Sequence, residues 1–231
     1  MFEYGFIMAG GMGTRLRPLT GAIPKPLLPI GDKPIIQFII ENMRNHGTKT
    51  IFISINYKKE IIKNYLRDGS RYGVEIIYIE ENEKTGTAGS LTYLPSDFSE
   101  DLLVSNGDLI CDIEYANIFE MLNNYDMVLT GIEKNFSIDF GVLNIEEENK
   151  LHSWSEKPNM TYIINGGIYG ISKESLDFIK ENVNKNDCLD MPCLWDLMKR
   201  ENKKLGVYVH KGKWHDVGRM EDYMALTNGG I

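Results

Sequence analysis

A short stretch near the start of the chain combines glycines with basic side chains, and this combination suits the binding of phosphate groups. Residues 10–34 read GGMGTRLRPLTGAIPKPLLPIGDKP and follow an apolar run, residues 4–9, that predicts a buried strand. The early glycines would let backbone N–H groups approach phosphate oxygens closely. Arg15 and Arg17 offer planar forks of donors and Lys25 a mobile charge, and no acidic residue interrupts them.

Two common phosphate-binding motifs do not account for this stretch. A Walker loop needs Gly-Lys followed by Ser or Thr, and the dinucleotide fingerprint needs the spacing Gly-x-Gly-x-x-Gly; neither is present. The prolines that follow the glycines prevent a helix from starting there. They are Pro18, Pro24, Pro26 and Pro29. An ordinary glycine-rich turn with solvated arginines is the alternative, but we expect an extended loop that wraps around a polyphosphate.

A carboxylate follows another apolar run. Residues 101–105 (DLLVS) predict a strand, and Asn106, Gly107 and Asp108 come directly after it. Ligands of open α/β sheets bind beyond the carboxyl ends of strands, so we expect Asp108 to meet the ligand of the glycine loop. Mg²⁺ prefers one or two carboxylates together with phosphate oxygens and water. The alternative is a plain Asn-Gly-Asp turn. Asp112 would lie near this site or near a helix start.

The composition limits the possible classes of protein. A length of 231 residues with 42% apolar content suits one domain with a real core. A net charge of −8 argues against a nucleic-acid or membrane partner. The sequence shows neither a signal peptide nor an apolar stretch that could span a bilayer. The cysteines, Cys111, Cys188 and Cys193, form no zinc pattern and are expected to be reduced thiols of a cytoplasmic protein.

Strand-like and helix-like runs alternate in the first half of the chain, which predicts βαβ units and a largely parallel sheet with crossover helices. The expected strands there are residues 4–9, 50–55, 74–79 and 101–105, and the expected helices are residues 34–46 and 58–66. The second half is less regular, and its strands are expected to form antiparallel additions that cap one side of the sheet. These are residues 127–132, 141–145, 151–154 and 162–171. Later helices are expected at 176–179, 194–198 and 219–226, with a strand at 205–209.

The motifs together resemble the sugar-1-phosphate nucleotidyltransferases, also called nucleotide-sugar pyrophosphorylases. The family signature G-x-G-T-R-L-x-P-x-T, then P-K-P and G-x-K-P, stands here at residues 11–20, 24–26 and 31–34. The resemblance implies an α/β, GT-A-like fold: a Rossmann-like, mixed, mostly parallel sheet flanked by helices, with a small antiparallel sugar-binding addition. It also implies one catalytic domain, residues 1–231, without a β-helix domain. The nucleotide would be bound by residues 1–112 and the sugar phosphate by residues 113–231.

The resemblance also assigns roles to residues. Arg15, Lys25 and Asp108 would be catalytic, and Asp108 and Asp216 would hold Mg²⁺. The closing motif W-x-D-x-G-x-x-E-D-Y at residues 214–223 carries Asp216. The nucleotide would contact Ala9, Gly10, Gly11, Gly13, Thr14, Arg15, Lys25, Thr85, Gly86, Thr87, Asn106 and Gly107. The sugar phosphate would contact Gly141 of the F-G-V motif, Glu156 and Lys157 of E-K-P, and Asn165 of N-G-G-I-Y.

The loop of residues 85–89, TGTAG, would face the base. This form resembles guanylyltransferases, so GTP is favoured, with uridylyl-, cytidylyl- or thymidylyltransferases of the same family as alternatives. The implied reaction joins an NTP and a sugar 1-phosphate to give an NDP-sugar and pyrophosphate, as a precursor of surface polysaccharides or glycoconjugates. A non-catalytic nucleotide-sugar sensor and a glycosyltransferase are the rival interpretations, and the chain is expected to be a monomer or a homodimer.

Overall fold

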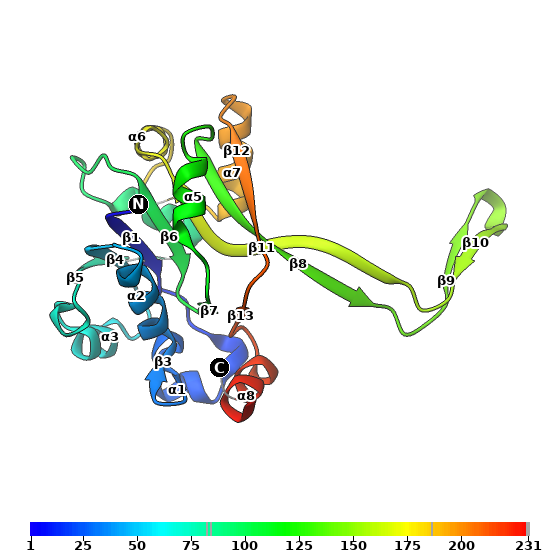
Figure 1. Cartoon of the computed structure of the whole chain (residues 1–231), viewed down its shortest axis with the longest axis horizontal. Coiled ribbons are helices and arrows are strands. Elements are labelled where there is room, and N and C mark those ends of the chain that lie inside the picture. Colours follow the sequence, from blue (N-terminus) through cyan, green and yellow to red (C-terminus); the bar gives the residue numbers. More distant parts are fainter. Residues whose placement is uncertain (82, 84, 186, 230–231) are drawn as a thin grey trace.

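A seven-stranded sheet forms the centre of the computed structural model, which describes residues 1–81, 83, 85–185 and 187–229 (Figure 1). The strand order is β12-β8-β11-β6-β1-β4-β5. Only β11 runs antiparallel to its neighbours β6 and β8; the other neighbouring strands are parallel. The strands are β1 (Tyr4–Met8), β4 (Thr50–Ile55), β5 (Glu75–Glu80), β6 (Leu102–Asn106), β8 (Met127–Ser137), β11 (Asn159–Ile171) and β12 (Leu205–His210).

Helices cover both faces of this sheet because its strands are apolar on both sides. In β1, for example, Ile7 packs into one core cluster and its neighbour Phe6 into the other. The first cluster includes α2 (Ile35–Asn45), α3 (Lys59–Leu66) and α5 (Tyr115–Met121). The second includes α6 (Lys173–Asn182) and α7 (Met191–Arg200), together with the short helices α4 (Gly86–Gly89) and η4 (Ser90–Tyr93).

The proline-rich segment after β1 winds through short elements and packs against the last helix. Buried Leu16, Ile30, Val217 and Tyr223 share a third core cluster, so the segment after β1 and the C-terminal segment meet beside the sheet. The elements concerned are η1 (Thr14–Leu16), α1 (Leu19–Ala22), η2 (Lys25–Leu27), β2 (Pro29–Ile30), β3 (Lys33–Pro34), β7 (Leu109–Cys111), β13 (Trp214–Asp216) and α8 (Met220–Gly229). A further 3-10 helix, η3 (Ser70–Tyr72), precedes β5.

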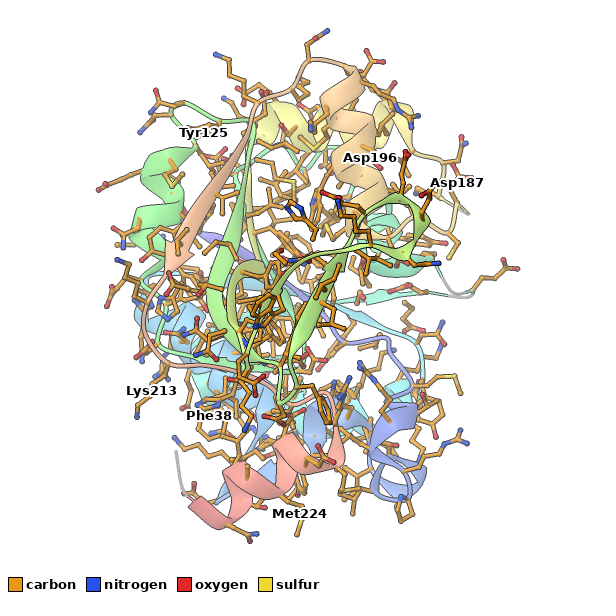
Figure 2. All side chains as sticks on the ribbon, turned by 90° about the vertical axis from the view of Figure 1, so that its right-hand side faces the viewer. Phe38, Tyr125, Asp187, Asp196, Lys213 and Met224 are labelled. Carbon is orange, nitrogen blue, oxygen red and sulfur yellow. The ribbon has the colours of Figure 1, made fainter. Side chains whose placement is uncertain are left out.

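Strands β8 and β11 leave the sheet as a long two-stranded ribbon (Figure 1). Their inner halves are buried and their outer halves are exposed. A hairpin of β9 (Val142–Ile145), η5 (Glu147–Asn149) and β10 (Leu151–Ser155) stands at the tip, far from the helices and the sheet. Figure 2 looks at the molecule from this tip and shows Asp196 of α7 and Met224 of α8 at opposite ends of the body.

The predicted fold class is confirmed: the sheet is mixed and mostly parallel, helices flank it, and a small antiparallel addition is present. The structure differs from the expectation for residues 127–171. Strands β8 and β11 do not cap a face of the sheet but continue it edge to edge, and β12 extends it further. Among the strands of residues 127–171, β9 and β10 form a separate antiparallel unit. The proposed division into two halves remains a prediction.

Candidate active site

The glycine loop lies at the carboxyl end of β1, where it borders a cavity of about 530 Å³. Gly13 has a φ of +60°, and a Cβ there would lie 2.9 Å from Thr20 and 3.0 Å from Lys25, so the position requires glycine. Thr20 Oγ1 donates to the carbonyl of Gly13 at 2.9 Å and fixes this turn. The lining residues are Met8, Gly10, Gly11, Met12, Gly13, Thr14, Ser54, Asn56, Glu81, Gly86, Thr87, Ser90, Asn106, Gly107, Asp108 and Asp190.

Asp108 reaches the same cavity from the turn between β6 and β7. The N–H of Gly107 donates to the carbonyl of Met8 at 2.9 Å, and a Cβ at Gly107 would lie 2.6 Å from that oxygen. Only glycine permits this close approach of the two strand ends. Lys25 forms an ion pair with Asp108 Oδ2. The other oxygen, Oδ1, is buried and accepts no hydrogen bond from any described residue.

Asp216 lies beside Asp108 because β13 pairs with β7. Asp216 is opposite Leu109 in this pairing, and the N–H of Val217 donates to the carbonyl of Asp108 at 3.0 Å. Partial removal from water and the charge of Asp108 raise the pKa of Asp216, while the positive charges of Lys25 and Arg15 oppose this shift. The negative charges of Asp108 and Asp216 repel one another, and Oδ1 of Asp108 is buried without a hydrogen bond from a described residue. A divalent cation between them would satisfy both conditions. Within residues 1–81, 83, 85–185 and 187–229, no group of three or more potential ligands gathers around one point.

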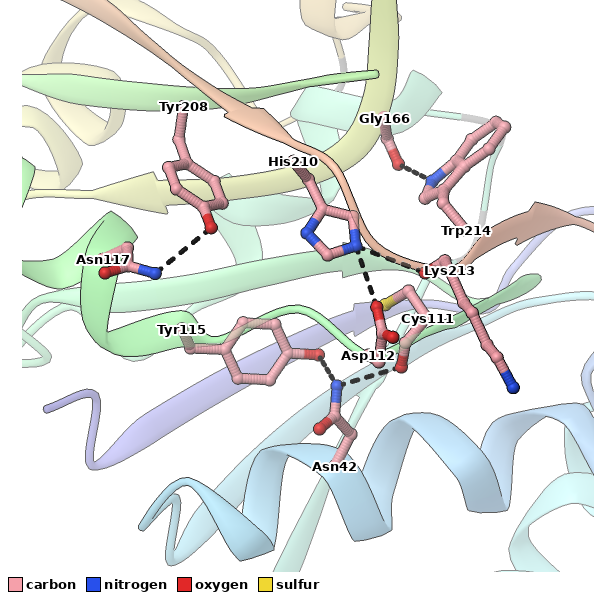
Figure 3. Close-up of polar contacts among 10 residues, drawn as sticks. All are labelled: Asn42, Cys111, Asp112, Tyr115, Asn117, Gly166, Tyr208, His210, Lys213 and Trp214. Carbon is pink, nitrogen blue, oxygen red and sulfur yellow. Dashed lines mark hydrogen bonds and ion pairs between the residues drawn. The ribbon is translucent and has the colours of Figure 1, made fainter. Parts of the chain in front are cut away.

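A network of hydrogen bonds holds β13, and with it Asp216, against the body (Figure 3). Trp214 Nε1 donates to the carbonyl of Gly166 at 2.9 Å. His210 Nε2 lies 3.0 Å from Asp112 Oδ1 and 3.3 Å from the carbonyl of Lys213. Asp112 therefore fixes the turn that leads into β13, which is a structural role at the border of the site.

The loop of residues 85–89 forms α4 and is tied to the start of α7. The N–H of Thr87 donates to Asp190 Oδ1 at 3.1 Å, and Thr87 Oγ1 accepts from the N–H of Met191 at 2.8 Å. The carbonyl of Leu189 accepts from the N–H groups of Ala88 and Gly89. These bonds position the loop at the edge of the cavity. The residues that hold the loop are about a hundred positions further along the sequence.

Five polar lining residues are not predicted from the sequence, namely Ser54, Asn56, Glu81, Ser90 and Asp190. Glu81 is buried, accepts from Thr85 Oγ1 at 2.5 Å, and has its other oxygen 3.3 Å from where a Cβ of Gly10 would lie. Asn56 and Glu81 each follow a parallel strand, β4 and β5, so the rule that ligands bind beyond strand ends could have found them. Asp190 precedes α7 and follows no strand, so this rule does not predict its place at the cavity.

The predicted nucleotide-binding residues mostly gather at the cavity. Gly10, Gly11, Gly13, Thr14, Gly86, Thr87, Asn106 and Gly107 line it, as does Asp108. Ala9 is buried behind the loop and donates to the carbonyl of Ser54 at 3.0 Å. Thr85 is buried behind Glu81. Arg15 and Lys25 are not among the lining residues; Lys25 reaches the site through its ion pair with Asp108.

The predicted sugar-phosphate residues fall into two places. Asn165 lies near the cavity: it accepts from the N–H of Gly167 at 3.1 Å, and Gly167 packs against Asn106. Gly141, Glu156 and Lys157 instead lie at the outer end of the ribbon, where a Cβ on Gly141 would be 3.1 Å from Glu156 Oε2. Lys157 has a φ of +44°, an uncommon conformation for a residue with a side chain. The structure does not bring these three residues to the cavity of the same chain.

The fold is that of enzymes that transfer nucleotidyl groups. The family model described as "Nucleotidyl transferase" matches residues 4–229, and the chain belongs to this family. HddC from Yersinia pseudotuberculosis is similar in structure, with a TM-score of 0.76, 28% sequence identity and complete coverage of both chains. The same protein has been solved in complex with GMP-PN.

Sequence relatives agree with this membership. D-glycero-alpha-D-manno-heptose 1-phosphate guanylyltransferase of Campylobacter jejuni is 33% identical over 192 residues, which cover 78% of this chain and 86% of that protein. The bifunctional protein GlmU of Methanococcus maripaludis is 33% identical over 228 residues, 96% of this chain but only 53% of that protein. The chain thus spans about half the length of one curated relative and most of another. Across the described ranges, no helix is both long and apolar enough to cross a bilayer.

Proposed function

We propose that this chain transfers a nucleotidyl group from GTP to a sugar 1-phosphate, giving a GDP-sugar and pyrophosphate for the synthesis of surface polysaccharides or glycoconjugates. The observation that carries the choice of GTP is the buried carboxylate of Glu81 in the lining of the cavity. A carboxylate only accepts hydrogen bonds, and guanine offers adjacent N–H donors on its pairing edge. Uracil and thymine offer one donor between two acceptors and suit this carboxylate less well. The guanylyltransferase relative and the GMP-PN complex of HddC support the same choice.

Charge neutralisation and alignment dominate this reaction, since two anions must meet. The sugar phosphate oxygen attacks the α-phosphorus in line and pyrophosphate leaves. The glycine loop holds the triphosphate, Arg15 stabilises the leaving pyrophosphate, and Lys25 offsets the charge near the α-phosphate. Lys157 orients the sugar phosphate, while Glu156 and Asn165 contact sugar hydroxyls.

Asp108 and Asp216 are the residues that would hold Mg²⁺. The unpaired Oδ1 of Asp108 and the neighbouring carboxylate of Asp216 fit a hard cation that prefers oxygen ligands. When bound, the cation supplies additional positive charge for the phosphate oxygens. Without it, Lys25 is the group that pairs with Asp108.

A pyrophosphate-release assay with the four NTPs and a panel of sugar 1-phosphates tests this function. We expect release with GTP and at least one sugar 1-phosphate, and a lower kcat/KM with UTP, CTP and dTTP. Preference for another NTP would overturn the choice of GTP while leaving the reaction in place. Tight binding of nucleotide sugars without pyrophosphate release under any combination would instead indicate a sensor.

A further inference from the structure

The residues that flank the hairpin at the tip of the ribbon are needed by the proposed reaction. They nevertheless lie far from the cavity of their own chain. The seven pairs from Asn165–Gly131 to Asn159–Ser137 are in uninterrupted register. Six steps along a strand at about 3.3 Å each separate the two ends by roughly 20 Å. Gly141, Glu156 and Lys157 lie beyond the outer pair. None of the described residues of the hairpin lines the cavity.

The hairpin also presents an apolar face that no described part of the chain covers. Leu143 stands opposite Trp154, and Ile145 stands opposite Leu151, so the four side chains share one face of the two strands. Trp154 is 70% exposed and Leu143 is 64% exposed. On the other face, Asn144 donates to Ser153 at 2.9 Å. An isolated two-stranded hairpin is marginally stable in water, so this apolar face requires a partner.

A matching apolar patch lies at the base of the ribbon. Ile163, Val207 and Val209 surround Gly131 and are all at least 37% exposed. Strands β8 and β12 run in the same direction as β6, so β12 ends, and β8 continues into the ribbon, at the edge of the sheet where β6 has its carboxyl end. The cavity opens at that same edge, beyond Asn106 of β6. A hairpin that covered this patch would therefore arrive beside the cavity.

We propose that two copies of this chain exchange hairpins, so that Gly141, Glu156 and Lys157 of one subunit complete the nucleotide cavity of the other. The proposal rests on the proposed function, because that function assigns these residues to the sugar phosphate. Bending the ribbon back within one chain would break its continuous ladder of backbone hydrogen bonds. A two-fold symmetric exchange leaves the ladder intact and gives each hairpin the same partner surface. The exchange also brings Lys157, whose backbone conformation is uncommon, from the distant tip of the ribbon to the partner's cavity.

Doubly tagged heterodimers test whether the site is shared. One subunit carries Asp108→Ala and the other Lys157→Ala, and the two are co-expressed with different tags and purified over both. In the exchanged arrangement, one of the two sites combines an intact cavity with an intact hairpin, so pyrophosphate release per dimer should be about half that of the doubly tagged wild type. Each single-variant homodimer should be inactive, and Lys150→Ala on the same hairpin should be fully active.

The reciprocal heterodimer gives the opposite result and excludes accidental rescue. It pairs the double variant Asp108→Ala, Lys157→Ala with the wild-type chain. Exchange makes both sites defective, so this dimer should be inactive, whereas sites formed within one chain would leave it half active. Inactivity of the first heterodimer, half activity of the second, or normal turnover by the Lys157→Ala homodimer would each overturn the proposal.

Sedimentation separates failure of the shared site from failure of the proposed function. The wild-type chain should sediment as a dimer, and Trp154→Glu, which places a charge on the apolar face, should sediment as a folded monomer. This measurement needs no substrate, so it stands even if no NTP and sugar 1-phosphate pair releases pyrophosphate. A monomeric wild type, or a Trp154→Glu variant that stays dimeric, would contradict the exchange.

Discussion

Asp108 connects two distant segments: its carboxylate pairs with Lys25 of η2, and its backbone carbonyl accepts from the N–H of Val217, just after β13. In Asp108→Asn the neutral amide leaves Lys25 without its anion and removes a proposed ligand of the metal. We expect kcat for pyrophosphate release to fall about 100- to 1000-fold, as when a donor is removed from a closed catalytic site. Circular dichroism should show an intact fold. The control Asp32→Asn changes an exposed acid in the turn between β2 and β3, and this variant should keep its activity.

Glu81 should decide between bases. Glu81→Gln keeps the size of the side chain and its bond to Thr85 but removes the negative charge. A charged hydrogen bond contributes about 1.5–3 kcal/mol, so kcat/KM for GTP should fall about 10- to 100-fold. The value for UTP should change little. Glu80→Gln is the matched control, because Glu80 is bound to Lys59 and Lys63, which lower its pKa to about 2. Equal losses for GTP and UTP would show that Glu81 only supports the loop.

The three thiols should differ in reactivity. Burial raises the pKa of Cys111 to about 11, so this thiol stays protonated and unreactive well above neutral pH. Cys188 and Cys193 are exposed. Iodoacetamide at pH 8 should therefore label Cys188 and Cys193 in the native protein and all three cysteines after unfolding, as peptide mass spectrometry would show. Rapid native labelling of Cys111 would mean that β7 opens readily.

At the scale of elements, the contact between α4 and α7 should control nucleotide affinity. Asp190 is at the N-cap of α7 but makes no capping bond there; it accepts instead from Thr87. Asp190→Ala removes this hydrogen bond and releases the loop. The free energy of nucleotide binding should therefore weaken by about 1 kcal/mol. We expect KM for GTP to rise several-fold while kcat changes less. Asp196→Ala, on an exposed turn of the same helix, should leave both constants unchanged.

Local sequence patterns predict the elements well, because strands buried on both faces are continuous apolar runs. The strand expected at residues 74–79 is observed as Glu75–Glu80, and the helix expected at 58–66 as Lys59–Leu66. What the patterns do not contain is the pairing of distant segments. Thr87 meets Asp190, and β11 joins β6 and β8 within the central sheet, through contacts that depend on tertiary packing.

In the candidate site too, local patterns predict some residue positions, and long-range packing determines the others. Gly13, Asp108 and Asp216 could be expected near one another, because the first two follow parallel strands and motifs link the third to them. The position of Lys157 could not be foreseen. The E-K-P motif predicts that Lys157 binds the sugar phosphate. How far Lys157 lies from the cavity depends instead on the unbroken register of β8 and β11.

At the scale of the whole molecule, the ribbon should be separable from the body. Ser137 and Asn159 are directly opposite, so an Asn-Gly turn can replace residues 138–158 without disturbing the inner pairs. Because the described hairpin residues contribute nothing to the cavity lining, this shortened chain should fold and bind GTP with nearly unchanged affinity by calorimetry. It should sediment as a monomer and release no pyrophosphate. The Lys157→Ala chain, which keeps the hairpin, should be inactive but dimeric, so the pair separates loss of one side chain from loss of assembly. A shortened chain that no longer bound GTP would show that the hairpin supports the nucleotide half of the site.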